Sequence, residues 1–312
     1  MFVSTTAVRI LLCAALGGAH LTAHAQAPMP IVKEGKTQKI APHVYLIPDE
    51  KVGMVPNVGI IVGSRATLVV DPGMGMKSGQ AVLREVEKLS KNKDLYIVNT
   101  HFHPEHTTGD IAFPASAKLI RSAAQQQDVE EMGLRWVAMF AARSAMLTDV
   151  LQEAKFRAPA EIFDKEKTLD LGGVRVKLLR LGPAHTRGDT AVFVEGAGVL
   201  FSGDLAMKQL FPAFATPQSR LSSWLTSLDA LDALRPTQVI GAHYDKGDAA
   251  TISAYRGYLT ALRERVAEMK KQGKSSDETA TTLRAEFHNK YPDWDQPLRI
   301  HTAATAIYRE LP

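Results

Sequence analysis

Three histidines and a glutamate occur within six residues, and this density constrains the chain more than any other feature of its sequence. They are His101, His103, Glu105 and His106. An apolar run at 95–98 directly precedes them and is typical of a short buried strand, so the cluster begins where a strand passes into a loop. Because side chains alternate along an extended segment, the imidazoles of His101 and His103 point the same way. A turn at Pro104 can bring the other two side chains to a neighbouring point, so this histidine loop (residues 99–110) predicts a metal site that suits two adjacent ions better than one.

The composition is that of an ordinary globular protein. The chain has 312 residues, of which 45% are hydrophobic and 22% charged, and this length is enough for a large core. Its net charge of +4 is small and no basic block stands out, so nucleic acid is not an expected partner. We expect a small-molecule substrate instead, and the sequence gives no prediction of the oligomeric state.

Residues 1–25 have the features of a secretory signal peptide. Arg9 is their only charged residue, an apolar core follows at 10–16, and residues 23–25 form an A-x-A cleavage site. The apolar core is too short to cross a bilayer, so we expect no membrane span after cleavage. The only cysteine, Cys13, lies in this segment. We therefore predict a periplasmic or secreted protein whose metal ligands are imidazoles and carboxylates.

The rest of the chain is predicted to form one domain. Residues 26–40 lack periodicity and are interpreted as a flexible lead-in, and residues 41–312 as a single domain with a helical C-terminal part. Strands and helices follow in two similar rounds, each with a hairpin, an aspartate, a helix, a strand and then a histidine. Ordered structure begins at 43–47, strands are expected at 58–62, 67–70, 95–99, 118–120, 174–179, 190–194, 199–201 and 238–240, and helices at 77–91, 122–155, 219–234, 250–272 and after a capping box at 275–278.

Further polar residues follow other predicted strands, and together with the histidine loop they form a set of motifs. The motifs are Asp71-Pro72-Gly73, H-x-H-x-[DE]-H at 101–106, H-T-x-G-D at 185–189, S-G-D at 202–204 and G-x-H at 241–243. In this order they resemble the metallo-β-lactamase superfamily, over roughly residues 43–245. The resemblance implies an α/β fold, the four-layer αβ/βα sandwich, with the metal site at one edge between the two sheets.

The resemblance also implies a role for each matched residue. Seven residues would hold two zinc ions: His101, His103 and His185 the first, Glu105, His106 and His243 the second, with Asp204 and a hydroxide between them. Asp204, His243 and Glu105 would thereby take part in catalysis, since zinc lowers the pKa of bound water from 15.7 to about 7. Asp71 would orient the ligand loop, and Asp189 would either support a ligand or form a turn.

Two of these residues depart from patterns common in the family. Glu105 stands where the family usually has aspartate, and the extra methylene moves the carboxylate of the second site by about one bond. Asp204 stands where many true β-lactamases of this fold carry cysteine or serine. That aspartate resembles the general hydrolase branches instead, such as thioesterases of the glyoxalase II type, lactonases and nucleases.

Several apolar residues are candidates for the substrate pocket. Phe211 and Phe214 follow Asp204 closely, and Tyr244 adjoins His243 and could donate a hydrogen bond to a developing oxyanion. A second group within the predicted helix at 122–155 could wall the pocket or simply pack as helix: Met132, Trp136, Met139 and Phe140.

These observations predict an exported, zinc-dependent hydrolase that uses a metal-bridging hydroxide to cleave a small ester, thioester, lactone or lactam. A second hypothesis is a mononuclear iron oxygenase of the same fold, similar to sulfur dioxygenases, if Glu105 does not hold a second metal. A third is a non-catalytic periplasmic protein that binds a metal or ligand. Metal content distinguishes the first two, with about two zinc ions against one iron per chain.

Overall fold

The computed structural model describes residues 28–312. The predicted signal peptide lies outside the described residues. Within them, no helix is long and apolar enough to cross a membrane.

The segment interpreted as a flexible lead-in is partly ordered. Residues 28–37 have no helix or strand, yet the Val32 side chain is buried and its backbone N–H donates to Ser78 Oγ at 3.3 Å. Strand β1 (Gln38–Ala41) then begins inside the predicted lead-in. The interpretation therefore does not hold for residues 38–40, which sequence periodicity alone did not reveal because β1 is short and mostly exposed.

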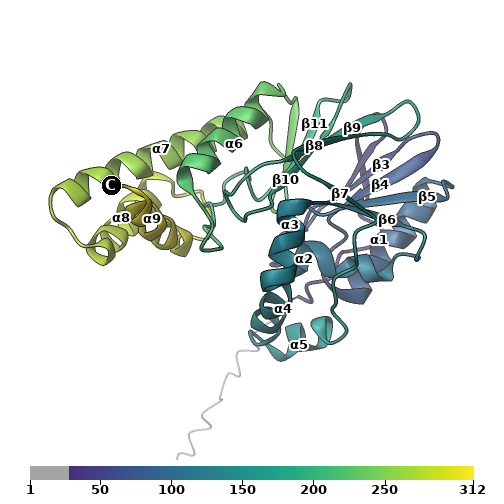
Figure 1. The fold of residues 1–312 in the computed structure, drawn as a ribbon, viewed down its shortest axis with the longest axis horizontal. Coiled ribbons are helices and arrows are strands. Elements are labelled where there is room, and N and C mark those ends of the chain that lie inside the picture. Colours follow the sequence, from purple (N-terminus) through teal and green to yellow (C-terminus); the bar gives the residue numbers. More distant parts are fainter. Residues whose placement is uncertain (1–27) are drawn as a thin grey trace, which may run out of the picture.

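The N-terminal half forms a mixed sheet whose strands lie side by side in sequence order (Figure 1). After β1 come β2 (Val44–Ile47), β3 (Val58–Val62), β4 (Ala66–Val70), β5 (Asp94–Val98), β6 (Lys118–Ser122) and β7 (Glu161–Phe163). Strands β1 to β4 pair antiparallel, and β4 to β7 run parallel. Helix α1 (Gly75–Leu89) connects β4 to β5. Because parallel strands end at the same edge of a sheet, the loops that follow β4 and β5 lie together.

The C-terminal half forms a second sheet with the order β12-β11-β10-β9-β8. Its strands are β8 (Glu166–Asp170), β9 (Arg175–Arg180), β10 (Thr190–Val194), β11 (Val199–Gly203) and β12 (Gln238–Gly241). Hairpin β10–β11 leads to helix α6 (Leu221–Ala233) and then to β12, which pairs parallel with β11. This order repeats β3–β4, α1 and β5 of the first sheet, so both predicted rounds are present.

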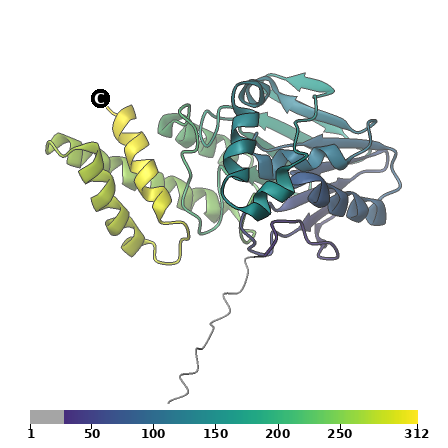
Figure 2. The same ribbon diagram turned by 90° about the horizontal axis from the view of Figure 1, so that it is seen from below.

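Alternating side chains place each sheet between two apolar layers. In β4, Leu68 and Val70 pack against the second sheet, whereas Val69 belongs to a cluster with residues of α1. In β11, Phe201 faces the first sheet, whereas Leu200 packs with α6 and helix α7 (Ala249–Lys271). Helices therefore cover the outer face of each sheet (Figures 1 and 2), and the predicted four-layer αβ/βα sandwich is confirmed.

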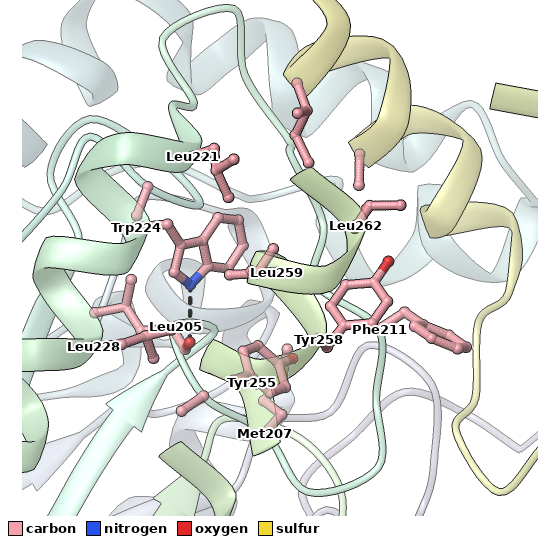
Figure 3. Close-up of a cluster of buried hydrophobic side chains, with 14 of the residues drawn as sticks. Leu205, Met207, Phe211, Leu221, Trp224, Leu228, Tyr255, Tyr258, Leu259 and Leu262 are labelled. Atoms are coloured by element: carbon pink, nitrogen blue, oxygen red, sulfur yellow. Dashed lines mark hydrogen bonds between the residues drawn. The ribbon is translucent and has the colours of Figure 1, made fainter. Parts of the chain in front are cut away.

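Helices α7, α8 (Ser276–Lys290) and α9 (Leu298–Glu310) extend the second half to one side (Figure 2). They share an aromatic core with α6, in which Trp224 Nε1 donates to the Leu205 carbonyl at 3.0 Å (Figure 3). Helix α8 begins with the predicted capping box between Ser275 and Glu278. Helix α9 has no separate counterpart among the predicted elements. Its Glu310 carboxylate accepts hydrogen bonds from the first backbone N–H groups of α6, so the last helix is tied to the body of the fold.

The stretch predicted as one helix at 122–155 is interrupted. It contains α3 (Ala123–Asp128), a π-helical turn (Val129–Gly133), α4 (Leu134–Ala141) and α5 (Ala145–Leu151). These helices lie beside the loop end of the first sheet (Figure 1).

The histidine loop is packed against α1 through glycine. The loop continues as the short helix α2 (Pro104–Thr107) and a 3-10 turn (Thr108–Ala112). A Cβ placed on Gly79 of α1 would lie 2.1 Å from the carbonyl oxygen of Gly109, and a Cβ on Gly109 would lie 2.5 Å from that of Pro72. Backbone therefore touches backbone here, and a larger residue requires the loop to move.

Candidate metal centre

The chain changes direction at Pro104, so the side chains before it and after it point to different places. Pro104 lies at the start of α2, where its missing N–H would have no intrahelical partner. His101 and His103 precede the helix, and Glu105 and His106 lie on it. Although the four residues are close in sequence, His101 and His103 belong to one group of metal-donor atoms, and Glu105 and His106 belong to another.

Three residues from the second half complete the cluster. Asp204 directly follows β11, His243 comes two residues after β12, and His185 lies in the loop between β9 and β10. Six of the seven predicted ligands are buried, and the His243 side chain is 12% exposed. Strand-end positions in both sheets therefore converge on one buried site.

The donor atoms form three overlapping groups, and within each group every donor lies within 4.8 Å of the others. The groups are His101, His103 and His185; Glu105, His106 and His243; and His101, His106 and Asp204. The first two are the predicted ligand triads. In the first triad, His103 Nδ1 lies 2.9 Å from His101 Nε2 and 3.3 Å from His185 Nε2. Donors arranged tetrahedrally about zinc at about 2.0–2.1 Å lie roughly 3.3 Å apart, so the spacing fits one ion.

The carboxylate of Asp204 lies between the two triads. Its Oδ2 is 3.5 Å from His185 Nε2, and its Oδ1 is 4.0 Å from His243 Nε2. Each oxygen therefore faces a histidine of a different triad. A carboxylate in this position can serve both ions.

Several buried atoms of the cluster have no hydrogen-bond partner among residues 28–312. They include His106 Nε2, Glu105 Oε2 and Asp204 Oδ1. An unpaired buried polar atom costs about 1–3 kcal/mol, and a divalent cation that accepts nitrogen and oxygen lone pairs removes this cost. The residues present therefore fit two divalent cations, and imidazoles with carboxylates suit zinc.

The ring nitrogens that face away from the cluster are held by hydrogen bonds. His185 Nδ1 lies 2.7 Å from the Ala213 carbonyl, and His243 Nδ1 lies 2.9 Å from the Val55 carbonyl. Because a carbonyl accepts, both rings carry their proton on Nδ1 and leave Nε2 free for a metal. His103 is held differently, since Trp136 stacks on its ring with centroids 4.0 Å apart.

Asp71 organises the histidine loop, as its predicted role requires. Its Oδ1 accepts the backbone N–H of Thr100 at 2.7 Å, and its Oδ2 accepts the Thr100 hydroxyl at 2.7 Å and lies 3.0 Å from His106 Nδ1. Asp71 adopts a left-handed conformation with φ of 54°, which is uncommon outside glycine. Burial lowers the pKa of His106, but the carboxylate of Asp71 and other acidic neighbours outweigh it and raise this pKa to about 9.

Asp189 supports the loop that carries His185. Its carboxylate accepts the hydroxyl of Thr186 at 2.6 Å and the backbone N–H of Thr186 at 3.0 Å. Burial raises the pKa of Asp189 to about 8. Of the two interpretations of this residue, the geometry favours support of the ligand loop.

Burial also sets the protonation of the other donors. It lowers the pKa of His101, His103 and His185, so these imidazoles are neutral and keep a lone pair for a metal. Burial raises the pKa of Glu105. For Asp204, burial is outweighed by the neighbouring histidines, and the net shift of its pKa is downward.

The metal donors open into a cavity of about 380 Å³. One wall comes from α4 and the residues after it, a second from the loop at 49–54, and a third from the start of α9. The residues that line it around the donors include Asp49, Lys51, Met54, Trp136, Phe140, Arg143, Leu210, Tyr244, Gln296 and Arg299. Trp136 and Phe140 therefore wall the cavity, as one interpretation of the 122–155 stretch proposed, whereas Met132 and Met139 do not line it.

Two predicted pocket residues lie elsewhere. The Phe211 side chain is fully buried among Tyr258, Tyr291 and Trp294, and Figure 3 shows it beside Tyr258 in the helical core. The Phe214 ring packs on Trp224 and borders a separate surface hollow. Proximity to Asp204 in sequence was misleading because these rings pack into the aromatic core, Phe214 against Trp224 of α6 and Phe211 against Tyr258 of α7 and the residues after α8.

Tyr244 lines the cavity, but its hydroxyl is engaged. The Tyr244 hydroxyl donates to the carboxylate of Asp295. Burial and this carboxylate raise the pKa of Tyr244 to about 12. The proposed donation to an oxyanion is therefore not supported by the position of its proton.

Sequence reasoning missed the basic residues of the cavity. Arg299 lies on α9, and Arg143 follows α4. Neither belongs to a motif, so only the fold brings them to the donors.

The sequence profile that describes the metallo-beta-lactamase superfamily matches residues 52–243, which is more than half of the chain. The chain belongs to this superfamily. The match contains all seven predicted ligands and ends before helices α7 to α9. Membership in this superfamily supports the prediction of a metal-dependent hydrolase.

Among similar proteins, a linear primary-alkylsulfatase from Pseudomonas sp. (strain ATCC 19151) is 23% identical over 214 aligned positions, covering 59% of this chain and 40% of the relative. The inverting sec-alkylsulfatase Pisa1 from Pseudomonas sp. superposes with a TM-score of 0.65 at 16% identity, over 88% of this chain and 50% of that one. A metallo-beta-lactamase family protein from Thermus thermophilus gives a TM-score of 0.63 at 18% identity, over 87% and 95%. These structural likenesses show the fold, and the chain spans half or less of the two alkylsulfatases.

Proposed function

We propose that the protein is an exported hydrolase with two zinc ions that cleaves a small ester, thioester, lactone or lactam. The observation that carries the proposal is the carboxylate of Asp204, whose two oxygens face His185 of one triad and His243 of the other. A site for a single ion does not require a carboxylate in that position. When bound, zinc supplies a Lewis acid and a hydroxide nucleophile near neutral pH.

The residues of the chain would prepare this chemistry. His101, His103 and His185 would hold the first ion, Glu105, His106 and His243 would hold the second, and Asp204, which faces His185 and His243, would be available to both. Asp71 keeps the His106 ring in the orientation that presents Nε2. Trp136 excludes water from one side of the site by covering His103.

Sulfate esters join the substrate candidates because two similar proteins are named as alkylsulfatases. Two bound metal ions could cleave a sulfate ester with the same hydroxide, provided that the site tolerates negative charge. The basic residues of the cavity meet this requirement.

The test combines metal analysis with a substrate panel. The metal content of the mature protein is measured as purified and again after loading with zinc. Both forms are then assayed against lactam, lactone, thioester, aryl ester, phosphodiester and sulfate ester substrates. We expect about two zinc ions per chain and turnover of at least one substrate class. A single iron per chain would favour the oxygenase hypothesis, and saturated metal with no turnover would favour a binding protein.

A variant connects the metal to the activity. His103→Ala removes one of the three metal-donor atoms of the first triad, Nδ1, which lies close to the donor nitrogens of His101 and His185. We therefore expect loss of both activity and bound metal. His288→Ala is the control, because this histidine is exposed on α8. Full activity in the His103 variant would contradict the assignment.

Export is tested separately. The predicted signal peptide at 1–25 should be removed during secretion, leaving a mature N-terminus near Gln26. Mass determination of the protein from the periplasmic fraction would show this processing, and an intact N-terminus would contradict it.

A further inference from the structure

The cavity above the metal donors has basic walls that the hydrolytic chemistry does not use. Lys51, Arg143 and Arg299 line it. Lys51 is paired with Asp245 at 3.2 Å, whereas the two arginines form no ion pair among residues 28–312. Two guanidinium groups thus line one cavity without forming an ion pair with any carboxylate of the described residues.

Arg299 is held in place without being neutralised. It lies on the first turn of α9 and is half-buried, and its Nη1 donates to the Phe211 carbonyl at 3.1 Å. Asp295 is committed to Tyr244 and to the backbone N–H of Gln296. One edge of the guanidinium is therefore anchored, and its other N–H groups remain available to a ligand.

Arg299 lies in the same cavity as the metal donors. His103, His185 and Asp204 line this cavity together with Arg299. A molecule bound at these donors therefore lies within the range of the guanidinium charge.

Arg143 lies on another wall, where it is exposed and packs on one aromatic ring. Its Cζ is 4.0 Å from the centroid of the Phe140 ring, a cation–π arrangement that fixes the guanidinium beside the aromatic wall. Trp136 and Phe140 provide apolar area on the same wall.

The balance of charges at the cavity selects against cationic substrates. Its acidic lining residues are Asp49, Glu105 and Asp204. Glu105 and Asp204 are themselves metal donors, and the carboxylate of Asp49 accepts the backbone N–H groups of Lys51 and Tyr244. Bound divalent cations would make the site positive, and the field in a partly enclosed cavity would then increase the local concentration of anions.

We propose that the substrate is an anionic ester with an apolar portion, and that Arg299 binds its anionic group, assisted by Arg143. This inference rests on the proposed hydrolytic function. Sulfate, phosphate and carboxylate share the oxygen geometry that a guanidinium fork binds. The apolar portion packs against Trp136 and Phe140.

The experiment uses zinc-loaded enzyme and substrates that release the same chromophore. They are para-nitrophenyl sulfate, para-nitrophenyl phosphate, mono-para-nitrophenyl succinate and the neutral para-nitrophenyl butyrate. Arg299→Gln keeps a donor for the Phe211 carbonyl and removes the charge. We expect it to lower kcat/KM for the preferred anionic substrate by roughly 10- to 100-fold, mainly by raising KM, and to leave the butyrate unchanged.

Two further variants separate recognition from folding. Arg299→Lys retains the charge but loses the planar fork, so it should recover part of the lost kcat/KM. Arg309→Gln removes an exposed charge from the same helix and should leave all rates unchanged. Equal losses on the neutral and anionic substrates, or no loss on the anionic ones, would overturn the role of Arg299. The anionic substrate whose kcat/KM falls most in Arg299→Gln identifies the anionic group that Arg299 binds.

A binding measurement distinguishes failure of this inference from failure of the proposed function. Calorimetry compares benzenesulfonate with neutral methyl phenyl sulfone, on metal-free and zinc-loaded protein. Weaker binding of benzenesulfonate to Arg299→Gln in both forms supports the inference even if no ester is cleaved. Unchanged benzenesulfonate affinity in that variant would overturn it, even if the neutral ester is hydrolysed.

Discussion

Asp71 and Asp204 occupy equivalent positions in the two halves of the molecule, yet their carboxylates have opposite surroundings. Each follows the second strand of a hairpin and precedes a helix that leads to a parallel strand. Asp71 accepts hydrogen bonds from Thr100 and orients His106. Asp204 faces two histidines, and its Oδ1 has no hydrogen-bond partner among the described residues.

The difference shows how one strand-end position supports two tasks. On the first side, the adjacent loop carries four predicted ligands, and the aspartate fixes that loop. On the second side, the predicted ligands are single residues from separate loops, and the aspartate itself is presented to the metal. The role of each aspartate follows from whether its carboxylate oxygens already accept hydrogen bonds from the protein, as in Asp71, or remain free for a metal, as in Asp204.

The largest effect is expected for Asp204→Asn. The amide has no negative charge and only one acceptor oxygen, so it cannot serve both triads. We expect loss of bound zinc and a fall of hydrolysis to the uncatalysed rate, measured by metal content after dialysis and by initial rates. Asp232→Asn on α6, where the carboxylate is exposed, is the matched control. If Asp204→Asn keeps two zinc ions and hydrolyses substrate at the normal rate, Asp204 is not a metal ligand, and its proposed difference from Asp71 is wrong.

Chelation should affect the two aspartate variants differently. In wild type, metal removal leaves buried donor atoms without partners. Ligand at 100 times its Kd contributes about 2.7 kcal/mol of stability, so a chelator should lower Tm by at least about 5 °C. Asp71→Asn should still respond to the chelator, because its ligands remain, whereas Asp204→Asn should respond little. Scanning calorimetry with and without chelator measures the change in Tm. Equal changes in Asp71→Asn and Asp204→Asn would contradict the different roles assigned to the two aspartates.

Asp71→Asn should produce an intermediate effect. The amide weakens the orientation of His106 and of the histidine loop, and loss of such an outer hydrogen bond typically costs about 10- to 100-fold in metal affinity or activity. Competition with a chromogenic chelator measures the affinity. Excess zinc should restore most of the rate. A rate that excess zinc fails to restore would show that Asp71 does more than orient ligands.

The smallest effect is expected for Glu105→Asp. Glu105 Oε1 lies 3.8 Å from His106 Nε2, so the glutamate carboxylate already lies close to another donor of the second triad. Shortening it by one methylene should weaken the second ion by about 10-fold and leave the first unchanged. Zinc titration resolves the two sites. Stronger binding at the second site would indicate that glutamate is the poorer ligand here.

The sequence predicted the fold and the cluster because short apolar runs mark buried strands and because the motifs that follow them occur in an order that resembles a known superfamily. That resemblance implied the sandwich and the ligand set, and the strand-end positions of His101, Asp204 and His243 are visible in the chain. The assignment of Asp71 as an orienting residue came from a family resemblance, and the hydrogen bonds now give it a physical basis.

The cavity walls were predicted less well because they depend on tertiary packing. Phe211 lies near Asp204 in sequence, but the aromatic core of the C-terminal helices takes its side chain. Arg299 is distant from every motif, yet α9 brings it to the cavity. Neither outcome could be read from spacing, since both are set by how α7 to α9 pack on the second sheet.

The glycine contact between α1 and the histidine loop has a consequence for protein engineering. Gly109 N also donates to the Gly73 carbonyl at 2.8 Å, so α1, the Asp71 turn and the loop are joined main chain to main chain. The loop transplanted alone into another scaffold would lose the backbone contacts that hold its shape. The segment to transplant is therefore the whole stretch from β4 through the 3-10 turn. In a library of variants, Gly79 should tolerate fewer substitutions than its distance in sequence from any ligand suggests.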